Sequence, residues 1–421
     1  MNSIRRDGCP RVLMFAPAFA PNFFSEAITT SKIVLALMQR GWQFDVVSSG
    51  APGPQYSNLW CDPWSSLQHR THQVRYKLGR PLTRAVDLAV QTWRLKYPIE
   101  GLRWAARAQA LGLSLHKKNP YNLIMSRSPI EAGHLAAAGF AKSTGLAWLA
   151  NWNDPPNHIW PPPYRGSRGR FQGWVSSRFT AFAMTNASVS TFPCKRLKDY
   201  VLRSMPSLHN VRTAVVPHVG LGRRVSERPQ NRTRCFTICH AGNLSSERDP
   251  DVFFDGVARF VAHAKPEHRI SIDLIGANPE SLFQKARNRG VEQFLRLLPG
   301  RPYAETLREI CTADVVILIE APCAEGIFLP SKLVDYAQAG RPILAISPRA
   351  GTVRDLLDET GAGIAVDCLS PVEVAQGIGN MYHSFKAGTL GTEFPTERLW
   401  NRFAPEAVAE LYEDLVAELR S

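Results

Sequence analysis

The stretch "RVLMFAPAFAPNFFSEAITTSKIVLALMQRGWQFDVVSS" (residues 11–49) contains one complete strand–helix–strand pattern. An apolar run at residues 11–17 indicates a buried strand, helix-spaced apolar residues before Gly41 indicate a helix, and residues 43–49 indicate a second strand. Such a unit joins two parallel strands by a right-handed crossover. The stretch therefore predicts a parallel α/β sheet. The turn after the first strand lacks the glycine-rich dinucleotide fingerprint, which removes the main support for an NAD-type cofactor.

The same alternation continues along the chain. Further strands are predicted within residues 121–128, 145–156, 187–193, 213–220, 235–240, 270–276, 294–300, 314–320 and 342–347. A polar segment with a proline, residues 221–234, is predicted to link two domains. We therefore expect a Rossmann-like N-terminal domain over residues 1–220 and a second one over residues 235–395. Residues 396–421 are predicted to form an amphipathic helix that packs back on the N-terminal domain.

Length and composition limit the class of protein. The 421 residues suffice for two domains of about 200 residues each. The eight cysteines show no C-x-x-C spacing, which indicates reduced thiols rather than disulfides or zinc ligands. No apolar run is long enough to span a membrane, and the start of the chain lacks the apolar core of a signal peptide. We therefore expect a cytoplasmic protein.

The positive charge is concentrated in the first half of the chain. Residues 1–234 carry 32 Lys/Arg against 10 Asp/Glu, whereas residues 235–421 carry 18 against 26. Part of the excess lies in a predicted basic helical insertion at about residues 60–120, whose amphipathic pattern can lie on a membrane or simply face solvent. An anionic surface, either phospholipid or nucleic acid, is the expected partner of such a half. No nucleic-acid-binding module is recognisable, so the inner face of the plasma membrane is favoured.

Ligands of open α/β sheets bind beyond the carboxyl ends of the strands, so candidate site residues should follow strands. After the predicted strand 235–240 comes "AGNLSSERDP", in which Gly242 lets the backbone approach a ligand closely. Arg248 precedes a predicted helix start, where a guanidinium can bind phosphate beside the positive helix end. The alternative, that Asp249 only caps the helix and Arg248 is solvated, stays open.

The second candidate segment is "EGIFLPSKLVDYAQAGRPILA" (residues 325–345). Ser331 can cap a helix whose first turn contains Lys332, a charge of the wrong sign for a helix N-terminus unless an anion lies there too. Asp335 follows one turn later and could accept hydrogen bonds from a diol such as ribose. Two cations and an acid after neighbouring strands are typical of a nucleoside-diphosphate site, although an exposed lysine and a structural aspartate remain the alternative.

These segments resemble the retaining GT-B glycosyltransferases of family 4, in particular members that build cell-envelope or capsular polysaccharide. The matching pieces, in the family's order, are "PAFAPNFFSEA", "WNDPP", "VVPH", "AGNLSSERDP" and "LPSKLVDYAQAGRPILA". The resemblance implies two Rossmann-like domains that face each other across a cleft. It further implies transfer of a sugar, with retention of configuration, from a nucleotide-diphospho-sugar (UDP type by default) to a lipid-linked or polysaccharide acceptor. No cofactor and no metal ion are expected.

The resemblance also implies the donor-site residues, which are Gly242, Asn243, Arg248, Leu298, Lys332, Leu333 and Asp335. Arg248 and Lys332 would bind the diphosphate and act in catalysis. Asp335 occupies the second acidic position of the family's E-x7-E motif, which usually binds ribose, and is one methylene shorter than the usual Glu. Ile327 stands in the first acidic position, so Glu325 is predicted to contact the donor sugar instead.

In the N-terminal domain, Asp154 follows a predicted strand and could orient an acceptor hydroxyl, or it could simply form a turn before proline. Glu26 and Arg127 are further candidates for binding the acceptor, and His134 is predicted to be structural. Three other functions stay open on the sequence: a non-catalytic GT-B paralogue, a nucleotide-sugar epimerase and, with less support, a nucleic-acid-binding protein.

Overall fold

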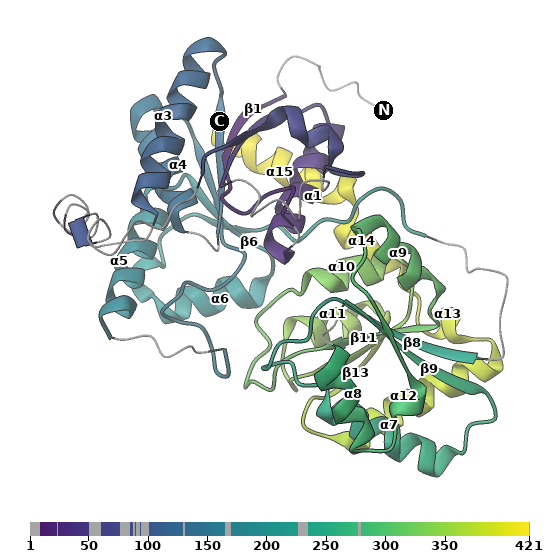
Figure 1. Cartoon of the computed structure of the whole chain (residues 1–421). Helices are drawn as coiled ribbons and strands as arrows, with labels where there is room; N and C mark the ends of the chain where they lie inside the picture. Colours follow the sequence, from purple (N-terminus) through teal and green to yellow (C-terminus); the bar gives the residue numbers. More distant parts are fainter. Residues whose placement is uncertain are drawn as a thin grey trace. The chain divides into compact units, whose positions relative to one another are not determined.

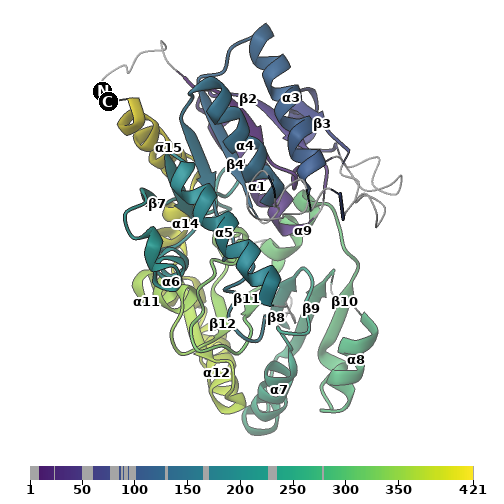
Figure 2. The same ribbon diagram turned by 90° about the vertical axis from the view of Figure 1, so that its left-hand side faces the viewer.

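The computed structural model describes residues 9–22, 24–49, 60–75, 85, 86, 89, 93, 101–128, 131–164, 170–225, 235–276 and 279–420 (Figure 1). The chain divides into two compact units. Unit 1 comprises Met1–Trp160, Arg165–Val219 and Pro405–Ser421, and unit 2 comprises Pro161–Tyr164 and Gly220–Ala404. Each unit contains a parallel sheet with helices on its faces, as Figure 2 shows from a second side.

Strands and helices alternate along unit 1. Its described elements are β1 (Arg11–Phe15), α1 (Ser25–Gln39), β2 (Gln43–Ser48), η2 (Ser65–Arg70), β3 (Thr71–Gln73), α3 (Leu102–Lys118), β4 (Leu123–Arg127), α4 (Glu131–Thr144), β5 (Trp148–Asn151), α5 (Arg170–Asn186), β6 (Val189–Phe192), α6 (Lys195–Ser204), η3 (Pro206–Leu208), β7 (Thr213–Val215) and α15 (Pro405–Arg420). The strands pair in the order β3-β2-β1-β4-β5-β6-β7, and every pairing is parallel.

Unit 2 repeats this architecture. Its described elements are β8 (Cys235–Ala241), α7 (Asp251–Ala264), β9 (Arg269–Ile275), α8 (Pro279–Arg287), η4 (Glu292–Phe294), β10 (Leu295–Leu298), α9 (Tyr303–Thr312), β11 (Val315–Ile319), α10 (Ser331–Gln338), β12 (Ile343–Ser347), α11 (Thr352–Thr360), β13 (Gly363–Asp367), α12 (Pro371–Ala387), α13 (Leu390–Glu393) and α14 (Glu397–Phe403). The strands pair in parallel in the order β10-β9-β8-β11-β12-β13.

Both strand orders reverse direction beside the first strand of the unit. In unit 1 the chain crosses from one side of β1 to the other to form β4, and in unit 2 it crosses from one side of β8 to form β11. The helices that connect such strands leave a crevice at the carboxyl ends of the two central strands, where open α/β sheets bind ligands. The strand order therefore predicts that ligand-binding residues follow β1, β4, β8 and β11.

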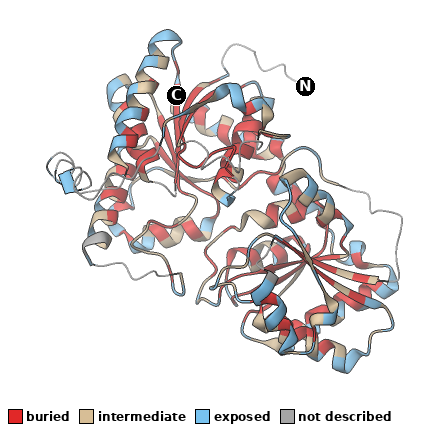
Figure 3. Cartoon of the chain, viewed as in Figure 1, coloured by how far each residue is buried: buried red, intermediate tan, exposed pale blue. Residues whose placement is uncertain are grey.

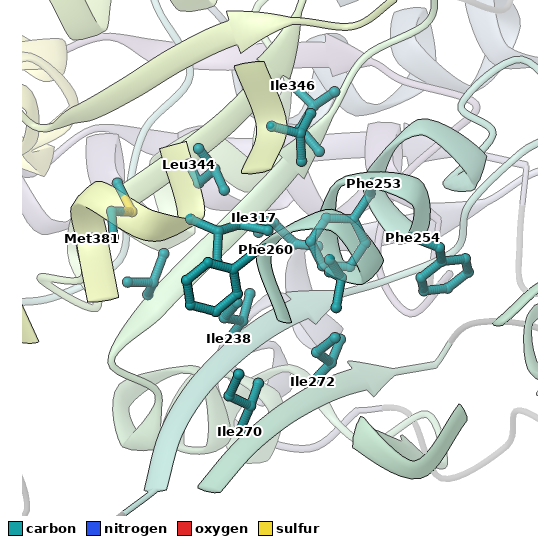
Figure 4. Close-up of a cluster of buried hydrophobic side chains, with 14 of the residues drawn as sticks. Ile238, Phe253, Phe254, Phe260, Ile270, Ile272, Ile317, Leu344, Ile346 and Met381 are labelled. Atoms are coloured by element: carbon teal, nitrogen blue, oxygen red, sulfur yellow. The ribbon is translucent and has the colours of Figure 1, made fainter. Parts of the chain in front are cut away.

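The central strands are buried on both faces, as β11 and β12 are throughout, which explains their nearly continuous apolar runs (Figure 3). In unit 2 the core lies between the sheet and the helices α7 and α12, and Figure 4 shows how the aromatic rings of α7 meet aliphatic side chains of the strands. The labelled members of this cluster are Ile238, Phe253, Phe254, Phe260, Ile270, Ile272, Ile317, Leu344, Ile346 and Met381. This core fixes the strand ends that carry the candidate site.

The predicted fold class, two Rossmann-like parallel-sheet domains, is correct. The details differ in two places. The predicted basic insertion at about residues 60–120 contains β3 and α3, which belong to the sheet and its flanking layer because Trp104, Ala105 and Ala108 of α3 are buried. Residues 76–100 of this predicted insertion lie largely outside the described residues.

The C-terminal segment also differs from the prediction. Residues 396–421 form two helices rather than one, and they belong to different units, since α14 is part of unit 2 and α15 of unit 1. α15 packs beside α1, where Arg40 donates to Glu413 at 2.8 Å and the ring of Trp42 meets that of Tyr412. Within the described part of the chain, no helix is both long and apolar enough to cross a membrane.

The close packing of α7 on α12 gives a test of the unit 2 core. A Cβ on Gly256 of α7 would lie 2.3 Å from Cγ1 of Val374, whereas a Cβ on Gly379 of α12 would meet Phe260 at an ordinary 3.8 Å. We expect Gly256→Ala to destabilise the protein by about 1–3 kcal/mol through overpacking. Gly379→Ala should be neutral or stabilising by up to about 1 kcal/mol, because alanine favours helix. Urea unfolding measures both, and equal effects would contradict the packing described.

Candidate functional site

Lys332 and Gly242 form the centre of the candidate site in unit 2. Lys332 lies in the first turn of α10, and its Nζ donates to the carbonyl oxygen of Asn243 at 3.1 Å. A Cβ on residue 242 would lie 2.9 Å from Lys332 Cε, and Gly242 has a φ of +94°. Glycine alone combines this backbone conformation with so close an approach of the lysine. The structure thus brings together three residues that the sequence assigned to one site.

A buried histidine holds the lysine. His240 Nδ1 lies 3.1 Å from the carbonyl oxygen of Ile317, and because a carbonyl only accepts, Nδ1 carries the proton. Nε2 therefore accepts from Lys332 Nζ at 3.0 Å. Burial and the charge of Lys332 keep the pKa of His240 well below its usual value. Burial, and then the charge of Arg248, lower the pKa of Lys332 to about 7. Lys332 is thus a half-buried cation. The two groups that accept its hydrogen bonds, His240 Nε2 and the carbonyl oxygen of Asn243, carry no negative charge.

Arg248 lies in the loop after β8, as predicted, and an aromatic pair positions it. Its Nε donates to Tyr164 Oη at 3.4 Å, and its guanidinium carbon lies 5.9 Å from the centroid of the Tyr164 ring. The rings of Tyr164 and Phe328 meet edge to face, with centroids 5.2 Å apart. A guanidinium against an aromatic face keeps its charge while its movement is restricted. Arg248 and Lys332 are close enough for each charge to affect the same groups.

Asp335 lies one turn after Lys332 on α10 and accepts a hydrogen bond from Tyr303. The Tyr303 hydroxyl donates to Asp335 Oδ1 at 2.7 Å. Burial, together with the charge of Asp335, raises the pKa of Tyr303 well above its usual value, so the phenol stays protonated and donates. Tyr303 begins α9, the helix that follows β10 in the chain, and its hydroxyl fixes the orientation of the Asp335 carboxylate.

Leu298 ends β10, where two glycine backbones lie close together. The amide of Gly276 donates to the carbonyl oxygen of Leu298 at 2.9 Å. Gly276 has a φ of +72°, and a Cβ there would lie 3.4 Å from the Cα of Gly300. The loops after β9 and β10 thus run close to each other, and Leu298 is half-buried beneath them.

Glu320 is a functional candidate that the sequence reasoning missed. It directly follows β11 and is 7% exposed, and its amide donates to the carbonyl oxygen of Ile346. Its Oε2 is buried and has no hydrogen-bond partner among the residues that the structure describes. Burial raises the pKa of Glu320 to about 7, although the charges of Arg248 and Arg354 act against this rise. A Cβ on Gly326 would lie 3.5 Å from both carboxylate oxygens.

Several predicted donor residues have other roles in the structure. Ile327, at the first acidic position of the motif, is fully buried, so this position holds a core side chain rather than a ligand contact. Leu333 is fully buried as well, and its amide donates to the carbonyl oxygen of Pro330. Glu325 is half-buried and its carbonyl oxygen accepts from Cys323 Sγ at 3.2 Å. Ser331 is the first helical residue of α10 rather than its cap.

The three predicted acceptor residues lie at the carboxyl edge of the sheet in unit 1. Arg127 ends β4 and is 3% exposed, and its Nη2 donates to Asn153 Oδ1 at 2.8 Å and to Thr29 Oγ1 at 3.2 Å. Burial lowers the pKa of Arg127, and the charges of Asp154 and Glu26 are among those that oppose this effect. Asp154 and Glu26 are thus each within electrostatic reach of Arg127.

Two other sequence predictions concern histidine and metal. His134 is fully buried on α4, with Nδ1 2.7 Å from Ser126 Oγ, and burial lowers its pKa to about 3. It therefore stays neutral and inaccessible, as a structural residue does. The described ranges contain no group of three or more His, Cys, Asp or Glu side chains that could hold a metal ion.

The sequence contained a signal for Glu320 but not for its neighbours. An acid directly after an apolar strand is costly to bury, and this feature of "DVVILIE" could have identified Glu320. His240 is part of a strand and reads as an ordinary strand residue. Tyr164 is 84 residues from Arg248 in sequence, so no local pattern connects them.

No protein-family model matches the chain, and no curated protein matches it. Several solved structures do match the chain. A glycosyltransferase from Rickettsia africae is 11% identical with a TM-score of 0.67, covering 98% of this chain and 99% of that one. HepE of Anabaena in complex with UDP is 14% identical with a TM-score of 0.66, covering 97% and 100%. WaaG, a glycosyltransferase involved in lipopolysaccharide biosynthesis, is 11% identical with a TM-score of 0.62, covering 95% and 99%.

At such identities the likeness establishes the fold. The chain has the two-domain Rossmann-like fold of the GT-B glycosyltransferases, along nearly its full length and theirs.

The unpartnered carboxyl of Glu320 predicts a specific pH dependence of stability. Its pKa is about 7 when folded and 4.5 in the reference state, so the folded protein binds the extra proton between these values. Stability conferred by the protonated form is therefore lost as pH rises from about 4.5 to 7, by on the order of 3 kcal/mol. In Glu320→Gln this loss should be absent. Urea unfolding of the nucleotide-free protein at pH 4.5, 6 and 7.5 measures the difference.

Asp358→Asn provides the matched control for this change of carboxyl to amide. Asp358 is exposed in the last turn of α11. The pH profile of Asp358→Asn should follow that of the wild type. A Glu320→Gln profile that also follows the wild type would show that the buried carboxyl does not titrate as described.

Proposed function

We propose that the protein is a glycosyltransferase that moves a sugar from a nucleotide-diphospho-sugar to an acceptor hydroxyl. The observation that carries this proposal is the pair of cations at the end of β8, where Lys332 lies against Gly242 and Arg248 lies nearby. A diphosphate has the negative charge that complements this pair of cations, beside the positive end of α10. The fold supports the proposal, and so do the structures of HepE with UDP, with UDP and glucose, and with UDP-glucose.

The order of the strands around the two cations suggests how the proposed donor lies along the edge of the sheet. The strands run in the order β10-β9-β8-β11, and Leu298 ends the first of them. We assign the base to the loop at Leu298, the ribose to Asp335, and the diphosphate to Lys332 and Arg248. Tyr303 donates to Asp335 and so holds the carboxylate that would bind the ribose. UDP is the default nucleotide.

The proposed reaction breaks the bond between the anomeric carbon of the sugar and the distal diphosphate oxygen. The electron pair of this bond stays on the diphosphate. The acceptor oxygen forms the new bond to the anomeric carbon, and its proton passes to the released diphosphate. Lys332 and Arg248 would stabilise the charge that develops on the leaving diphosphate. Two fixed cations perform the role that a metal ion has in other enzymes, so the proposal requires none. The resemblance to family 4 favours retention of configuration.

We propose that unit 1 binds the acceptor. Asp154, Glu26 and Arg127 would bind the acceptor, and Asp154 would orient its hydroxyl. The charge excess of residues 1–234 supports an acceptor at an anionic membrane, since basic residues near such a surface contribute about 1 kcal/mol each. We therefore propose a lipid-linked or polysaccharide acceptor and a peripheral position on the inner face of the plasma membrane.

A panel of nucleoside diphosphates tests the donor site. UDP, GDP, ADP, CDP and dTDP are compared by thermal shift on the wild type, Arg248→Ala and Lys332→Ala. One nucleotide at 100 times its dissociation constant should stabilise the wild type by about 2.7 kcal/mol. Both variants should lose this stabilisation, because each removes a charge that binds the diphosphate. Lys386→Ala, which removes an exposed cation paired with Glu267, is the control and should respond like the wild type. Stabilisation by none of the five would refute the donor site.

Product analysis tests the reaction itself. Nucleoside diphosphate release from UDP-glucose, UDP-galactose, UDP-N-acetylglucosamine and GDP-mannose is measured with and without lipid-linked saccharides extracted from membranes. Release should require the acceptor and should fall by about 10²–10³-fold in Lys332→Ala, as for loss of one group that stabilises the transition state. Conversion of the sugar nucleotide without acceptor would indicate an epimerase instead. Binding without any turnover would indicate a non-catalytic paralogue.

A further inference from the structure

The segment Pro161–Tyr164 belongs to unit 2, although the residues up to Trp160 belong to unit 1. Unit 2 otherwise consists of Gly220–Ala404, so this segment comes from a distant part of the sequence. Three consecutive prolines precede Tyr164, and the ring of a proline fixes φ, which leaves the backbone few conformations. Tyr164 therefore joins unit 2 at little cost in conformational entropy.

Tyr164 contacts Arg248 in two ways. Its Oη accepts a hydrogen bond from Arg248 Nε at 3.4 Å, and its ring centroid lies 5.9 Å from the guanidinium carbon. The Tyr164 ring in turn meets the ring of Phe328 edge to face, with centroids 5.2 Å apart. Phe328 stands between Ile327 and Leu329, which are both buried. The guanidinium is thus contacted by the hydroxyl and by the ring of a residue that is itself fixed in position.

Arg248 needs such a contact because Lys332 repels it. Burial, and then the charge of Arg248, lower the pKa of Lys332, so the two cations lie within electrostatic reach of each other. Arg248 is half-buried in the polar loop after β8, and its side chain has several rotatable bonds. Repulsion favours the rotamers that carry the guanidinium away from Lys332. A group that opposes this movement keeps both cations where one diphosphate can bind them.

Tyr164 can hold the guanidinium without neutralising it. Burial raises the pKa of Tyr164, against the opposing effect of Arg248, so the phenol is uncharged at neutral pH. Its oxygen accepts from one of the five N–H groups of the guanidinium. His240 does the same for Lys332, because its neutral ring nitrogen accepts from the ammonium. Each cation is thus held by an uncharged group, and neither contact removes the positive charge that an anion binds.

We propose that Tyr164 is a positioning residue, which holds the guanidinium of Arg248 beside Lys332 and thereby raises the affinity for a diphosphate. This inference rests on the proposed function, in which these two cations bind the diphosphate of the donor. Tyr164 acts through Arg248 and requires no contact of its own with the nucleotide. Its hydroxyl and its ring both contribute, so loss of the hydroxyl alone has a smaller effect than loss of the whole side chain.

Affinities for nucleoside diphosphates test this role. Isothermal titration measures UDP, GDP, ADP, CDP and dTDP on the wild type, Tyr164→Phe, Tyr164→Ala and Tyr382→Phe. For the nucleotide that binds best, Tyr164→Phe should weaken binding by about 2- to 5-fold, through loss of a long hydrogen bond. Tyr164→Ala should weaken it by about 5- to 30-fold, because the ring contact is lost as well.

Tyr382→Phe is the matched control, since it removes another tyrosine hydroxyl that forms a hydrogen bond in unit 2. The Tyr382 hydroxyl accepts from the amide of His268 at 3.1 Å, and His268 directly precedes β9. This contact lies at the amino ends of the strands, at the opposite edge of the sheet from Lys332. Tyr382→Phe should therefore bind the nucleotide within about twofold of the wild type.

A combination of variants shows whether Tyr164 acts through Arg248. Tyr164→Ala is also made in Arg248→Ala, and the weak affinities of the single and the double variant are measured by ligand-observed NMR. With the guanidinium absent, loss of Tyr164 should change the affinity by less than about twofold, since the two residues act as a unit. A weakening by the same factor with and without Arg248 would show that Tyr164 only supports the structure of unit 2, and would overturn the proposal.

The other outcomes separate this inference from the function on which it rests. If the wild type binds none of the five nucleotides, the donor site fails and the inference fails with it. If the wild type binds and both Tyr164 variants bind equally well, the donor site stands and the role of Tyr164 is wrong. Circular dichroism checks that each variant is folded. Should Tyr164→Ala not fold, Tyr164→Phe, alone and combined with Arg248→Ala, gives the same comparison with the smaller factor.

Discussion

The contact between Lys332 and the neutral His240 is the interaction on which the site depends. An imidazole whose Nδ1–H is bound to a backbone carbonyl can only accept from the ammonium, and it contributes no negative charge. The lysine is thus fixed in position but not neutralised, and burial lowers its pKa to about 7. Gly242 completes the arrangement, since any side chain there would meet the lysine stem. A lysine that is held in this way can bind an anion.

The parallel topology decides what else can gather around that cation. All strands of unit 2 end at one edge, so residues far apart in sequence meet where their strands stop. Arg248 comes from the loop after β8, and Glu320 and Lys332 come from the chain that leaves β11. The strand order reverses between β8 and β11, and open α/β sheets bind ligands at such a point. The site follows from the topology, and its chemistry follows from a few side chains.

Much of this arrangement is predictable from sequence, for physical reasons. Apolar runs and helical spacing predict strands of both sheets because these strands are buried on both faces, and the rule that ligands bind after strands identifies Gly242, Arg248 and Lys332. The strand β3 was missed because it has only three residues, and β13 was missed because it is only partly buried and lacks a long apolar run. Tyr164 and Tyr303 act through tertiary contacts that no local pattern encodes.

The most direct measurement of the central claim is a crystal structure of the protein with the nucleoside diphosphate that binds it. The account predicts diphosphate oxygens at hydrogen-bond distance, about 2.7–3.2 Å, from Lys332 Nζ, with the guanidinium of Arg248 on the same group and the base toward Leu298. A diphosphate bound elsewhere in unit 2, or in unit 1, with Lys332 still bound only to His240 and Asn243, would contradict it.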